Sequence, residues 1–385
     1  MVASLLLKRL RTCLAIAFYA VDVCATFQDF GIPPSNAIVE IRAFNVVNLT
    51  SVTGSHQVFA PVLPGHVNLT VPVHSFLIEH KSSHSRLLFD LGVRKDPWNY
   101  PPAISAFFAA GIYSVPNDFK DIGQLLEQGG ISISSIDAVI WSHSHLDHIG
   151  DMSKFPNTTT LVIGPGTNKQ LYPEYPDGVL QASDFGNRSV HEVNFHESTL
   201  MFSGLEAIDY FEDGSLYLLN TPGHLPGHLA VLARVTPSSF ILLGGDSFHH
   251  PGQLRPRPRF QLHFPCPAHL RETTRSSIST DYFWSWGSQK DNFDTVSRAE
   301  PLLAISDLAD SVYADPVTAK VSVEKVATFD ADPDFLVIIA HDTSLMSHIP
   351  YFPAALNNWK ESKWKEDLVW RFVDENNPAF VFSPK

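Results

Sequence analysis

The chain has 385 residues, of which 44% are hydrophobic and only 17% charged, so it can bury a substantial core and is not intrinsically disordered. Its formal net charge of −13 argues against the phosphate backbone of a nucleic acid, or an anionic membrane surface, as a partner. Three widely spaced cysteines, Cys13, Cys24 and Cys266, predict neither a disulfide framework nor a cysteine-based zinc site. Any bound metal must therefore be held by histidine and carboxylate side chains.

Residues 1–36 are predicted to be an N-terminal appendage, either a signal segment or a disordered one. Basic residues at 8–11 precede a short apolar run at 13–21, as in a signal peptide, although Asp22 weakens the pattern. The run is too short to cross a bilayer as a helix, so we expect no membrane span. Cleavage of this segment stays open, and a cytoplasmic location is slightly favoured over secretion.

The remaining residues, 37–385, are predicted to form one α/β domain with an irregular insertion at about 247–291. Strand patterns occur first at 39–47, 71–79, 86–90 and 135–141, with a helix pattern at 119–128. A second series of strands is expected at 161–163, 206–211, 215–220, 229–235, 240–244 and 335–340, with helices at 296–312 and 317–329. Two series of strands with flanking helices predict a four-layer αββα sandwich.

Four side chains that can bind metal lie within six residues, directly after the strand at 135–141. They are His143, His145, Asp147 and His148. Imidazole and carboxylate groups need partners when they are buried, and a neutral imidazole is a common zinc ligand. In one turn, His143 and His145 can point to one side while Asp147 and His148 point to another, which suits two neighbouring metal ions.

Three further polar residues follow apolar strands and can join this cluster. His224 lies in the sequence Thr-Pro-Gly-His, Asp246 follows two glycines, and His341 follows the strand at 335–340. One such residue would be weak support for a metal site, because a strand-end aspartate is often only a turn residue. Three of them in this order predict a composite site at the strand ends.

These motifs resemble the metallo-β-lactamase superfamily, and within it the N-acyl homoserine lactonases, which are quorum-quenching enzymes. The resemblance runs from about residue 39 to the C-terminus. It rests on His143-x-His145-x-Asp147-His148, Thr221-Pro-Gly-His224, Gly245-Asp246, Ala340-His341-Asp342 and the strand-end turn Asp90-Leu-Gly92.

The resemblance implies one metal on His143, His145 and His224, a second on Asp147, His148 and His341, and Asp246 bridging both. His228 is then expected to support the site, and Asp90 to accept a hydrogen bond from a ligand imidazole. Two Zn²⁺ ions per chain are favoured for this ligand set, other divalent metals stay open, and no organic cofactor is implied.

The resemblance further implies a hydrolase in which a metal-bridging hydroxide opens a small-molecule lactone or related ester. Asp147, Asp246 and His249 are the expected catalytic residues. The lactonases carry a tyrosine three residues after the bridging aspartate, and here that position is His249, whose imidazole can donate a hydrogen bond or a proton to the leaving oxygen.

Two other activities stay open, an acyl thioesterase acting on a carrier- or coenzyme-bound chain and, with less support, a mononuclear iron oxygenase. The sequence fixes neither the substrate nor the oligomeric state. Four aromatic residues either line an acyl pocket or belong to the core, namely Phe248, Phe264, Trp284 and Trp286. Three arginines either bind a carboxylate or lie in a solvated loop, namely Arg255, Arg257 and Arg259.

Overall fold

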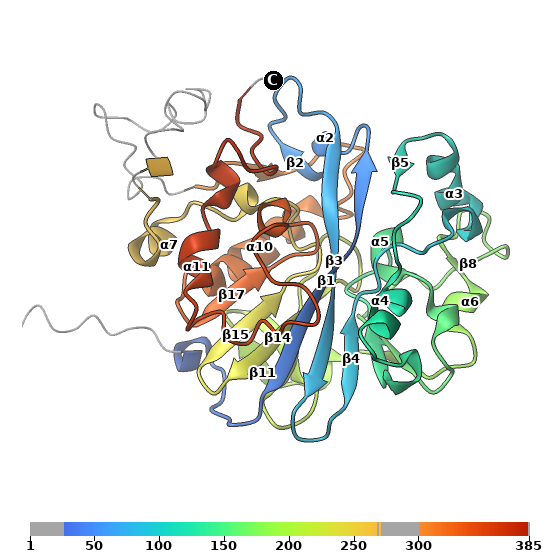
Figure 1. Cartoon of the computed structure of the whole chain (residues 1–385), viewed down its shortest axis with the longest axis horizontal. Coiled ribbons are helices and arrows are strands. Elements are labelled where there is room, and N and C mark those ends of the chain that lie inside the picture. The colour runs from blue at the N-terminus through green and yellow to red at the C-terminus, as the bar shows by residue number, and fades with distance from the viewer. Residues whose placement is uncertain (1–26, 268, 271–299, 384–385) are drawn as a thin grey trace, which may run out of the picture.

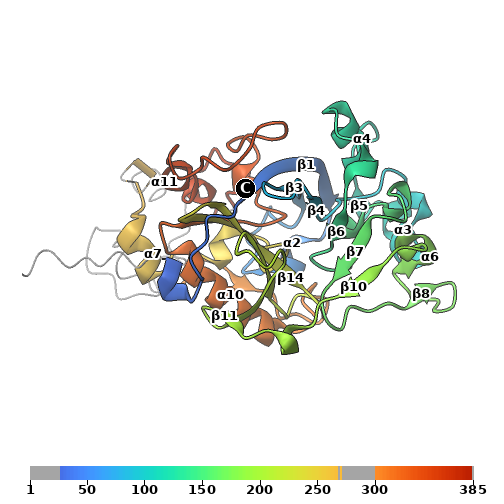
Figure 2. The ribbon, with the colours of Figure 1, turned by 90° about the horizontal axis from the view of Figure 1, so that it is seen from below.

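The computed structural model describes residues 27–267, 269–270 and 300–383. Two β-sheets pack face to face, and helices lie on the outer side of each sheet (Figure 1). Figure 2 shows the same layers from below, with α3, α4 and α6 at one end and α7, α10 and α11 at the other. The four-layer αββα sandwich predicted from the sequence is confirmed.

The first sheet has seven strands in the order β10-β7-β6-β4-β3-β1-β5. Its two longest strands pair antiparallel from Val39 opposite His80 to Ser51 opposite Leu69. The strands β4, β6, β7 and β10 then run parallel to one another. The bounds are β1 (Val39–Ser51), β3 (Leu69–His80), β4 (Arg86–Phe89), β5 (Tyr113–Ser114), β6 (Ala138–Ile140), β7 (Thr160–Ile163) and β10 (Val190–Glu192).

The second sheet has six strands in the order β11-β12-β13-β14-β15-β17. Neighbouring strands are antiparallel except for the parallel pair β15 and β17. The bounds are β11 (Leu200–Phe202), β12 (Leu205–Asp209), β13 (Leu216–Asn220), β14 (Leu229–Thr236), β15 (Ser239–Leu243) and β17 (Phe335–Ile338). Two small sheets pair β2 (Phe59–Ala60) with β16 (Ala304–Ile305) and β8 (Leu171–Tyr172) with β9 (Leu180–Gln181).

Strand alternation explains the layers. In β14, Leu229 and Val231 point into the core between the two sheets, whereas Ala230 and Leu232 point to the outer face. Because both faces are covered, the strand reads as a continuous apolar run. The outer face of the second sheet packs against α10 (Pro316–Asp330), whose Val323 and Val326 are buried there.

The other helices are short. The outer side of the first sheet carries α3 (Pro102–Ala109), α4 (Ile122–Gln128), α5 (Leu146–Ile149) and α6 (Ala182–Phe185) (Figure 1). Among the residues that the structure describes, the remaining α-helices are α2 (Ser55–Val58), α7 (Pro258–His263) and α11 (Trp364–Leu368). The 3-10 helices are η1 (Phe27–Phe30), η2 (Pro97–Asn99), η3 (Ile133–Ser135), η4 (Met152–Lys154), η5 (Phe195–Glu197), η6 (Pro251–Gln253), η7 (Thr343–Leu345) and η8 (Arg371–Val373).

Three sequence-based predictions differ from the structure. The strand at 161–163 was assigned to the second series, but β7 pairs with β6 in the first sheet, because a parallel crossover returns the chain there. The helix expected at 296–312 is wrong for residues 300–312, which contain only β16. The helix expected from residue 119 begins at Ile122, because the Asp121 side chain accepts a hydrogen bond from the Gln124 amide and caps it.

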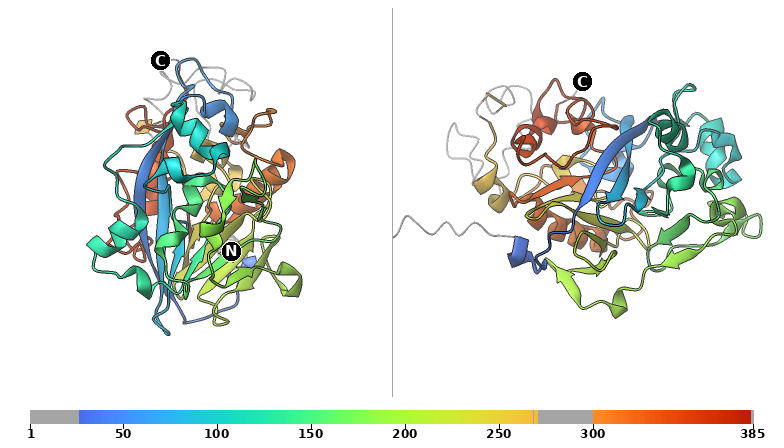
Figure 3. Two further views of the ribbon diagram at one scale, coloured as in Figure 1. Left: turned by 90° about the vertical axis from the view of Figure 1, so that its right-hand side faces the viewer. Right: turned by 60° about the horizontal axis from the view of Figure 1, so that its bottom comes forward.

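The described part of the N-terminal appendage packs on the second sheet. The Phe30 ring stacks on Phe329 of α10 with 5.0 Å between ring centroids, and Ile32 is buried. Figure 3 shows η1 in dark blue beside the orange C-terminal elements. The division at residue 36 stays a prediction, and residues 1–26 lie outside the described residues.

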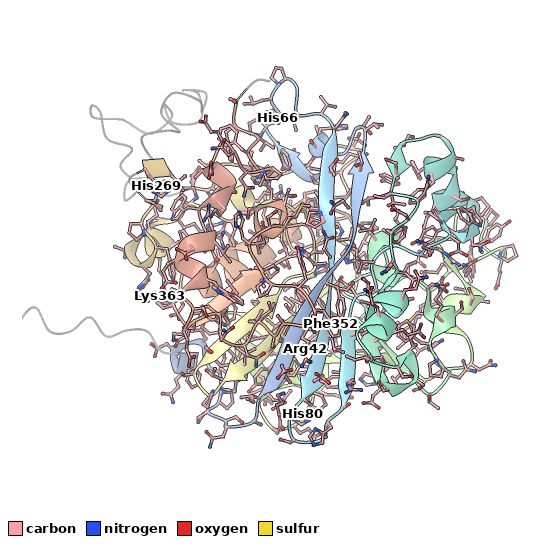
Figure 4. All side chains as sticks on the ribbon, viewed as in Figure 1. Arg42, His66, His80, His269, Phe352 and Lys363 are labelled. Carbon is pink, nitrogen blue, oxygen red and sulfur yellow. The ribbon has the colours of Figure 1, made fainter. Side chains whose placement is uncertain are left out.

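The chain after β17 returns across the first sheet. Phe352 stacks on Phe44 of β1 with 4.8 Å between ring centroids, and Arg42 Nε donates a hydrogen bond to the carbonyl oxygen of Pro353 (Figure 4). This contact ties the C-terminal segment to the strand at the centre of the molecule. Within the described ranges, no helix is both long and apolar enough to cross a bilayer.

Candidate metal centre

The candidate residues meet at one edge of the sandwich because five strands end there. In the first sheet, β4 and β6 are parallel, so Asp90 and His143 follow them at the same edge. In the second sheet, β15 and β17 are parallel, and β13 runs in the same direction because both β13 and β15 are antiparallel to β14. His224, Asp246 and His341 therefore emerge together, opposite His143.

The first ligand cluster consists of three imidazoles, from His143, His145 and His224. His143 Nε2 lies 2.9 Å from His145 Nδ1, and His224 Nε2 lies 3.0 Å and 2.9 Å from these two nitrogens. Four-coordinate zinc with Zn–N bonds of about 2.0 Å would place its nitrogen ligands about 3.3 Å apart. Three ring nitrogens converging at nearly this spacing form a suitable set of donors for one metal ion.

The second cluster combines Asp147, His148 and His341. Asp147 Oδ2 lies 3.3 Å from His341 Nε2, and Asp147 Oδ1 lies 3.7 Å from His148 Nε2. This set mixes one carboxylate with two imidazoles, so it carries a negative charge that the first cluster lacks. The two clusters are adjacent, because His143 and His148 ring centroids are only 4.1 Å apart.

Asp246 lies between the two clusters, with Oδ2 near imidazoles of both and Oδ1 near the second. Its Oδ2 is 3.4 Å from His224 Nε2 and 3.7 Å from His143 Nε2, while its Oδ1 is 3.3 Å from His341 Nε2. Oδ2 also lies 3.3 Å from His148 Nε2. A carboxylate in this position can contribute one oxygen to each cluster.

Backbone and side-chain partners orient the ligand imidazoles. His148 Nδ1 donates to Asp90 Oδ2 at 2.8 Å, His143 Nδ1 lies 3.0 Å from Ser142 Oγ, and His341 Nδ1 donates to the carbonyl oxygen of Pro72 at 2.9 Å. With each Nδ1 engaged, the Nε2 lone pairs face the centre, which is the usual way in which a protein fixes a metal-binding tautomer. The hydrogen bond expected for Asp90 is present, and its role in orienting a metal ligand stays a prediction.

Asp90 is held by a sharp turn at the end of β4. Its φ of 62° lies in the left-handed region, which aspartate adopts more readily than most residues. Its Oδ1 accepts a hydrogen bond from the Ser142 amide at 2.7 Å, and its Oδ2 accepts one from Ser142 Oγ at 2.8 Å. The carboxylate thus connects the end of one strand to the start of the histidine turn.

His228 supports the site without joining either cluster. Its Nδ1 donates toward Thr221 Oγ1, 2.9 Å away, and its Nε2 accepts a hydrogen bond from the Asp246 backbone amide at 3.0 Å. Because this lone pair is used, His228 is not available as a ligand. It instead holds the backbone of Asp246, in agreement with the supporting role expected from the sequence.

The histidine pKa values shift in opposite directions in the two clusters. Burial, together with the neighbouring imidazoles, holds the pKa of His143 and His224 well below the usual histidine value, so these rings stay neutral. Burial also lowers the pKa of His341, but Asp246 and Asp147 outweigh it and raise that pKa to about 10. The neutral imidazoles of the first cluster and the carboxylates beside the second can both bind a metal ion.

Orphaned polar atoms support the same conclusion. His148 Nε2 and Asp246 Oδ1 are buried and have no hydrogen-bond partner among the described residues. Such groups are costly to bury unless something satisfies them. The donor set and these two atoms therefore fit metal binding.

His249 and Tyr313 form a pair at the edge of the cluster. His249 Nε2 lies 3.2 Å from Asp246 Oδ2, and His249 Nδ1 lies 2.7 Å from Tyr313 Oη. Burial, and to a smaller degree the charge of Asp246, raises the pKa of Tyr313 well above the usual tyrosine value. Sequence reasoning missed Tyr313, because it lies 64 residues after His249, between two segments expected to be helical, and carries no local motif.

An open cavity of about 130 Å³ leads to Asp147, Asp246, His249 and His341. Its apolar wall was not anticipated and comes from separate segments, namely Leu49, Val58, Leu69, Val71, Leu146 and Val312. Ser51, Gln57 and Tyr113 supply the polar groups of the lining. The cavity can therefore hold a small apolar molecule with a few polar atoms against the cluster.

Those aromatic and basic residues proposed for substrate binding that the structure describes are not part of this cavity. Phe248 and Phe264 belong to two hydrophobic cores, and Trp284 and Trp286 lie outside the described residues. Arg255 forms a buried ion pair with Asp330 at 2.7 Å. The sequence left two alternatives for Arg255, namely binding a ligand's carboxylate or lying in a solvated loop. Both are wrong, because Arg255 is buried and the carboxylate that it binds belongs to Asp330 of the same chain.

Arg257 and Arg259 also have partners within the chain. Arg257 Nη2 lies 2.9 Å from Glu324 Oε1, and Arg259 Nη2 lies 3.9 Å from Asp332 Oδ2. Neither arginine lines the cavity at the cluster. The part of the chain that the structure describes therefore lines the cavity with the apolar wall and the few polar groups beside it.

The sequence model of the metallo-beta-lactamase superfamily matches residues 70–305, which include His143, His145, Asp147, His148, His224 and Asp246. The chain belongs to this superfamily and is a hydrolase of its fold. The expectation drawn from the histidine and aspartate motifs is thus confirmed at the level of the family.

Three curated relatives match about nine tenths of the chain. The chain is 37% identical over 358 residues to "Metallo-hydrolase mfmC" of Annulohypoxylon moriforme, covering 90% of that protein. It is 33% identical over 357 residues to "Gamma-lactamase FDB1" of Fusarium pseudograminearum, covering 84% of that protein. It is 36% identical to "Cytochrome P450 monooxygenase mpaDE'" of Penicillium brevicompactum, but spans only 38% of the length of that relative.

Solved structures share the fold at low sequence identity. B. thuringiensis AiiA with N-decanoyl-L-homoserine bound at its active site is similar to 83% of this chain, with a TM-score of 0.51 and 16% identity. The match covers 99% of the AiiA chain. This similarity supports the αββα fold expected from the sequence.

Proposed function

We propose that the protein is a binuclear metal-dependent hydrolase that opens a cyclic ester, in the manner of a lactonase. The observation that carries the proposal is the position of Asp246, whose carboxylate lies within 3.4 Å of imidazole nitrogens from both clusters of side chains that can bind metal. A carboxylate that serves two clusters is the arrangement expected for a two-metal hydrolytic site.

The residues divide into two ligand sets. His143, His145 and His224 would hold one ion. Asp147, His148 and His341 would hold the other, with Asp246 shared between the two. Zinc suits this combination of imidazole and carboxylate donors.

When bound, two such ions supply an activated water and polarise the substrate carbonyl. Asp246 and the two clusters would hold these ions, and the apolar wall of the cavity would contact the apolar part of the substrate. Ring opening adds the elements of water, because the carbonyl carbon gains an OH and the leaving oxygen gains a proton. His249 Nε2, 3.2 Å from Asp246 Oδ2, is placed to donate to that leaving oxygen.

A γ-lactam is the second candidate substrate. The 33% identity to a protein named Gamma-lactamase FDB1, over 90% of this chain, favours it. The same residues would serve, because amide cleavage also adds a hydroxyl to the carbonyl carbon and leaves an atom, nitrogen, that must gain a proton. The apolar cavity suits a small ring of either kind.

Two other activities have less support. A mononuclear iron oxygenase would need only one of the two clusters, and here all seven candidate ligands come together. An acyl thioesterase uses the same metal chemistry, so the distinction depends on the substrate and is made by assay.

The test is a hydrolysis panel with zinc-loaded protein. It compares N-acyl homoserine lactones, simple γ-lactones, γ-lactams and acyl thioesters, each followed by release of acid or thiol. The proposal is supported if lactones are hydrolysed and thioesters are not. If lactams are hydrolysed faster than lactones, the second candidate substrate is favoured. Exclusive turnover of thioesters, or no hydrolysis with about two metal equivalents bound, would contradict it.

A further inference from the structure

Both ring nitrogens of His249 have partners, one on each side of the imidazole. Nδ1 lies 2.7 Å from Tyr313 Oη, and Nε2 lies 3.2 Å from Asp246 Oδ2. A neutral imidazole carries one proton, so one nitrogen donates and the other accepts. Whether His249 donates into the cavity or offers it a lone pair therefore depends on the Tyr313 hydroxyl.

Gln253 holds the backbone beside this pair. Its Oε1 accepts hydrogen bonds from the backbone amides of His249 at 2.7 Å and His250 at 3.0 Å, and its Nε2 donates to the carbonyl oxygens of Val58 at 2.9 Å and Ala304 at 3.4 Å. These bonds fix the backbone of His249 and with it the position of the imidazole.

The contact with Asp246 selects the tautomer. An ionised carboxylate can only accept hydrogen bonds. An Nε2–H group facing Asp246 Oδ2 at 3.2 Å makes a favourable hydrogen bond, whereas an Nε2 lone pair at that position would face the oxygen lone pairs. The ring is further held by stacking on His341, with 5.5 Å between ring centroids.

The Tyr313 hydroxyl completes this pattern from the other side of the ring. A hydroxyl can both donate and accept, and Tyr313 Oη lies 2.7 Å from His249 Nδ1. With the single imidazole proton on Nε2, Nδ1 is an acceptor and the hydroxyl donates to it.

We propose that Tyr313 is a positioning residue that holds His249 in the tautomer protonated on Nε2. His249 then acts as a hydrogen-bond donor toward the substrate and does not serve as a metal ligand. This is notable because Asp246, His249 and His341 lie close enough together to hold a metal ion. The tautomer follows from the contacts alone, and only the target of the donated hydrogen bond rests on the proposed function.

The direct test is nitrogen NMR on the zinc-loaded protein labelled with ¹⁵N-histidine. The His249 signals are assigned by their loss in His249→Gln. We expect a protonated Nε2 and an unprotonated, hydrogen-bonded Nδ1. A proton on Nδ1, or an Nε2 shift typical of metal coordination, would overturn the proposal even if the enzyme hydrolyses lactones.

Tyr313→Phe removes the hydroxyl alone. We expect the His249 resonances to shift toward a mixture of tautomers and kcat to fall about 10- to 100-fold, as for loss of a partner that orients a reactive imidazole. KM should change by less than about threefold, because the group acts after binding. Unchanged resonances together with unchanged kcat would overturn the proposal.

Tyr217→Phe is the matched control. Tyr217 is fully buried on the second sheet, in the core that faces α10, so the change removes a hydroxyl of the same kind away from the cluster. Both the His249 resonances and kcat should stay as in the native protein. If the native protein hydrolyses no substrate, the proposed function fails, but the NMR experiment still decides the tautomer.

Discussion

The two ligand clusters come from the same turn yet provide contrasting environments. The first has only neutral imidazoles, because burial and neighbouring rings lower the pKa of His143 and His224. The second faces two carboxylates, which raise the pKa of His341 to about 10 despite its burial. The contrast shows that one short motif, completed by different strands, can build two unlike metal sites joined by Asp246.

The largest effect is expected from Asp246→Ala, because it removes the residue common to both clusters. Both metals should bind more weakly, and hydrolysis should fall by about 10³-fold or more, since metal activation supplies several kcal/mol. Elemental analysis and the hydrolysis assay measure the two effects. Asp307→Ala, at a side chain that is 71% exposed, is the control and should change neither. Full metal content in Asp246→Ala would contradict the bridging role.

His145→Ala and Asp147→Ala separate the two clusters. Each should abolish hydrolysis, and each should lose about one metal equivalent while keeping the other, because the ligand sets are distinct. Metal content after dialysis against a fixed zinc concentration is the measurement. Retained activity in both variants would refute the two-metal mechanism, and loss of both ions in each would show that the clusters bind cooperatively.

Asp90→Asn tests the support of the second cluster alone. Asp90 contacts His148 at 2.8 Å but none of the imidazoles of the first cluster except through Ser142. We expect about 10- to 100-fold weaker binding of one metal ion, the usual effect of losing a partner that orients a ligand histidine. Competition with a chromophoric chelator gives the two affinities. Equal weakening of both ions would mean that Asp90 organises the whole turn.

His249→Phe should leave both clusters filled and still slow the reaction. Loss of a hydrogen-bond or proton donor lowers turnover by about 10²-fold or more, whereas the seven ligands remain in place. The comparison of kcat with metal content is the readout. Unchanged turnover would show that His249 does not replace the tyrosine of the lactonases, and loss of metal would identify it as a ligand.

The sequence predicted which polar side chains meet better than it predicted their surroundings. His143 to His148 form one local motif, and His224, Asp246 and His341 each follow an apolar strand, so their meeting at one edge follows from strand direction. The sandwich was predictable for the same reason, because alternating and continuous apolar runs mark its strands.

Contacts between distant segments could not be predicted in this way. Tyr313 meets His249 across 64 residues, and the cavity wall combines β1, α2, β3 and the segment that holds Val312. The assignment of β7 to the wrong sheet has the same origin, because a short apolar run does not reveal its pairing partner. Local patterns specify what a segment can form, whereas side-chain neighbours depend on the whole topology.

The most direct test of the central claim is the anomalous scattering of zinc in a crystal of the zinc-loaded protein. The account predicts two peaks about 3.5–4 Å apart, one beside His143, His145 and His224 and one beside Asp147, His148 and His341, with Asp246 between them. A single peak, or two peaks that do not share Asp246, would contradict it.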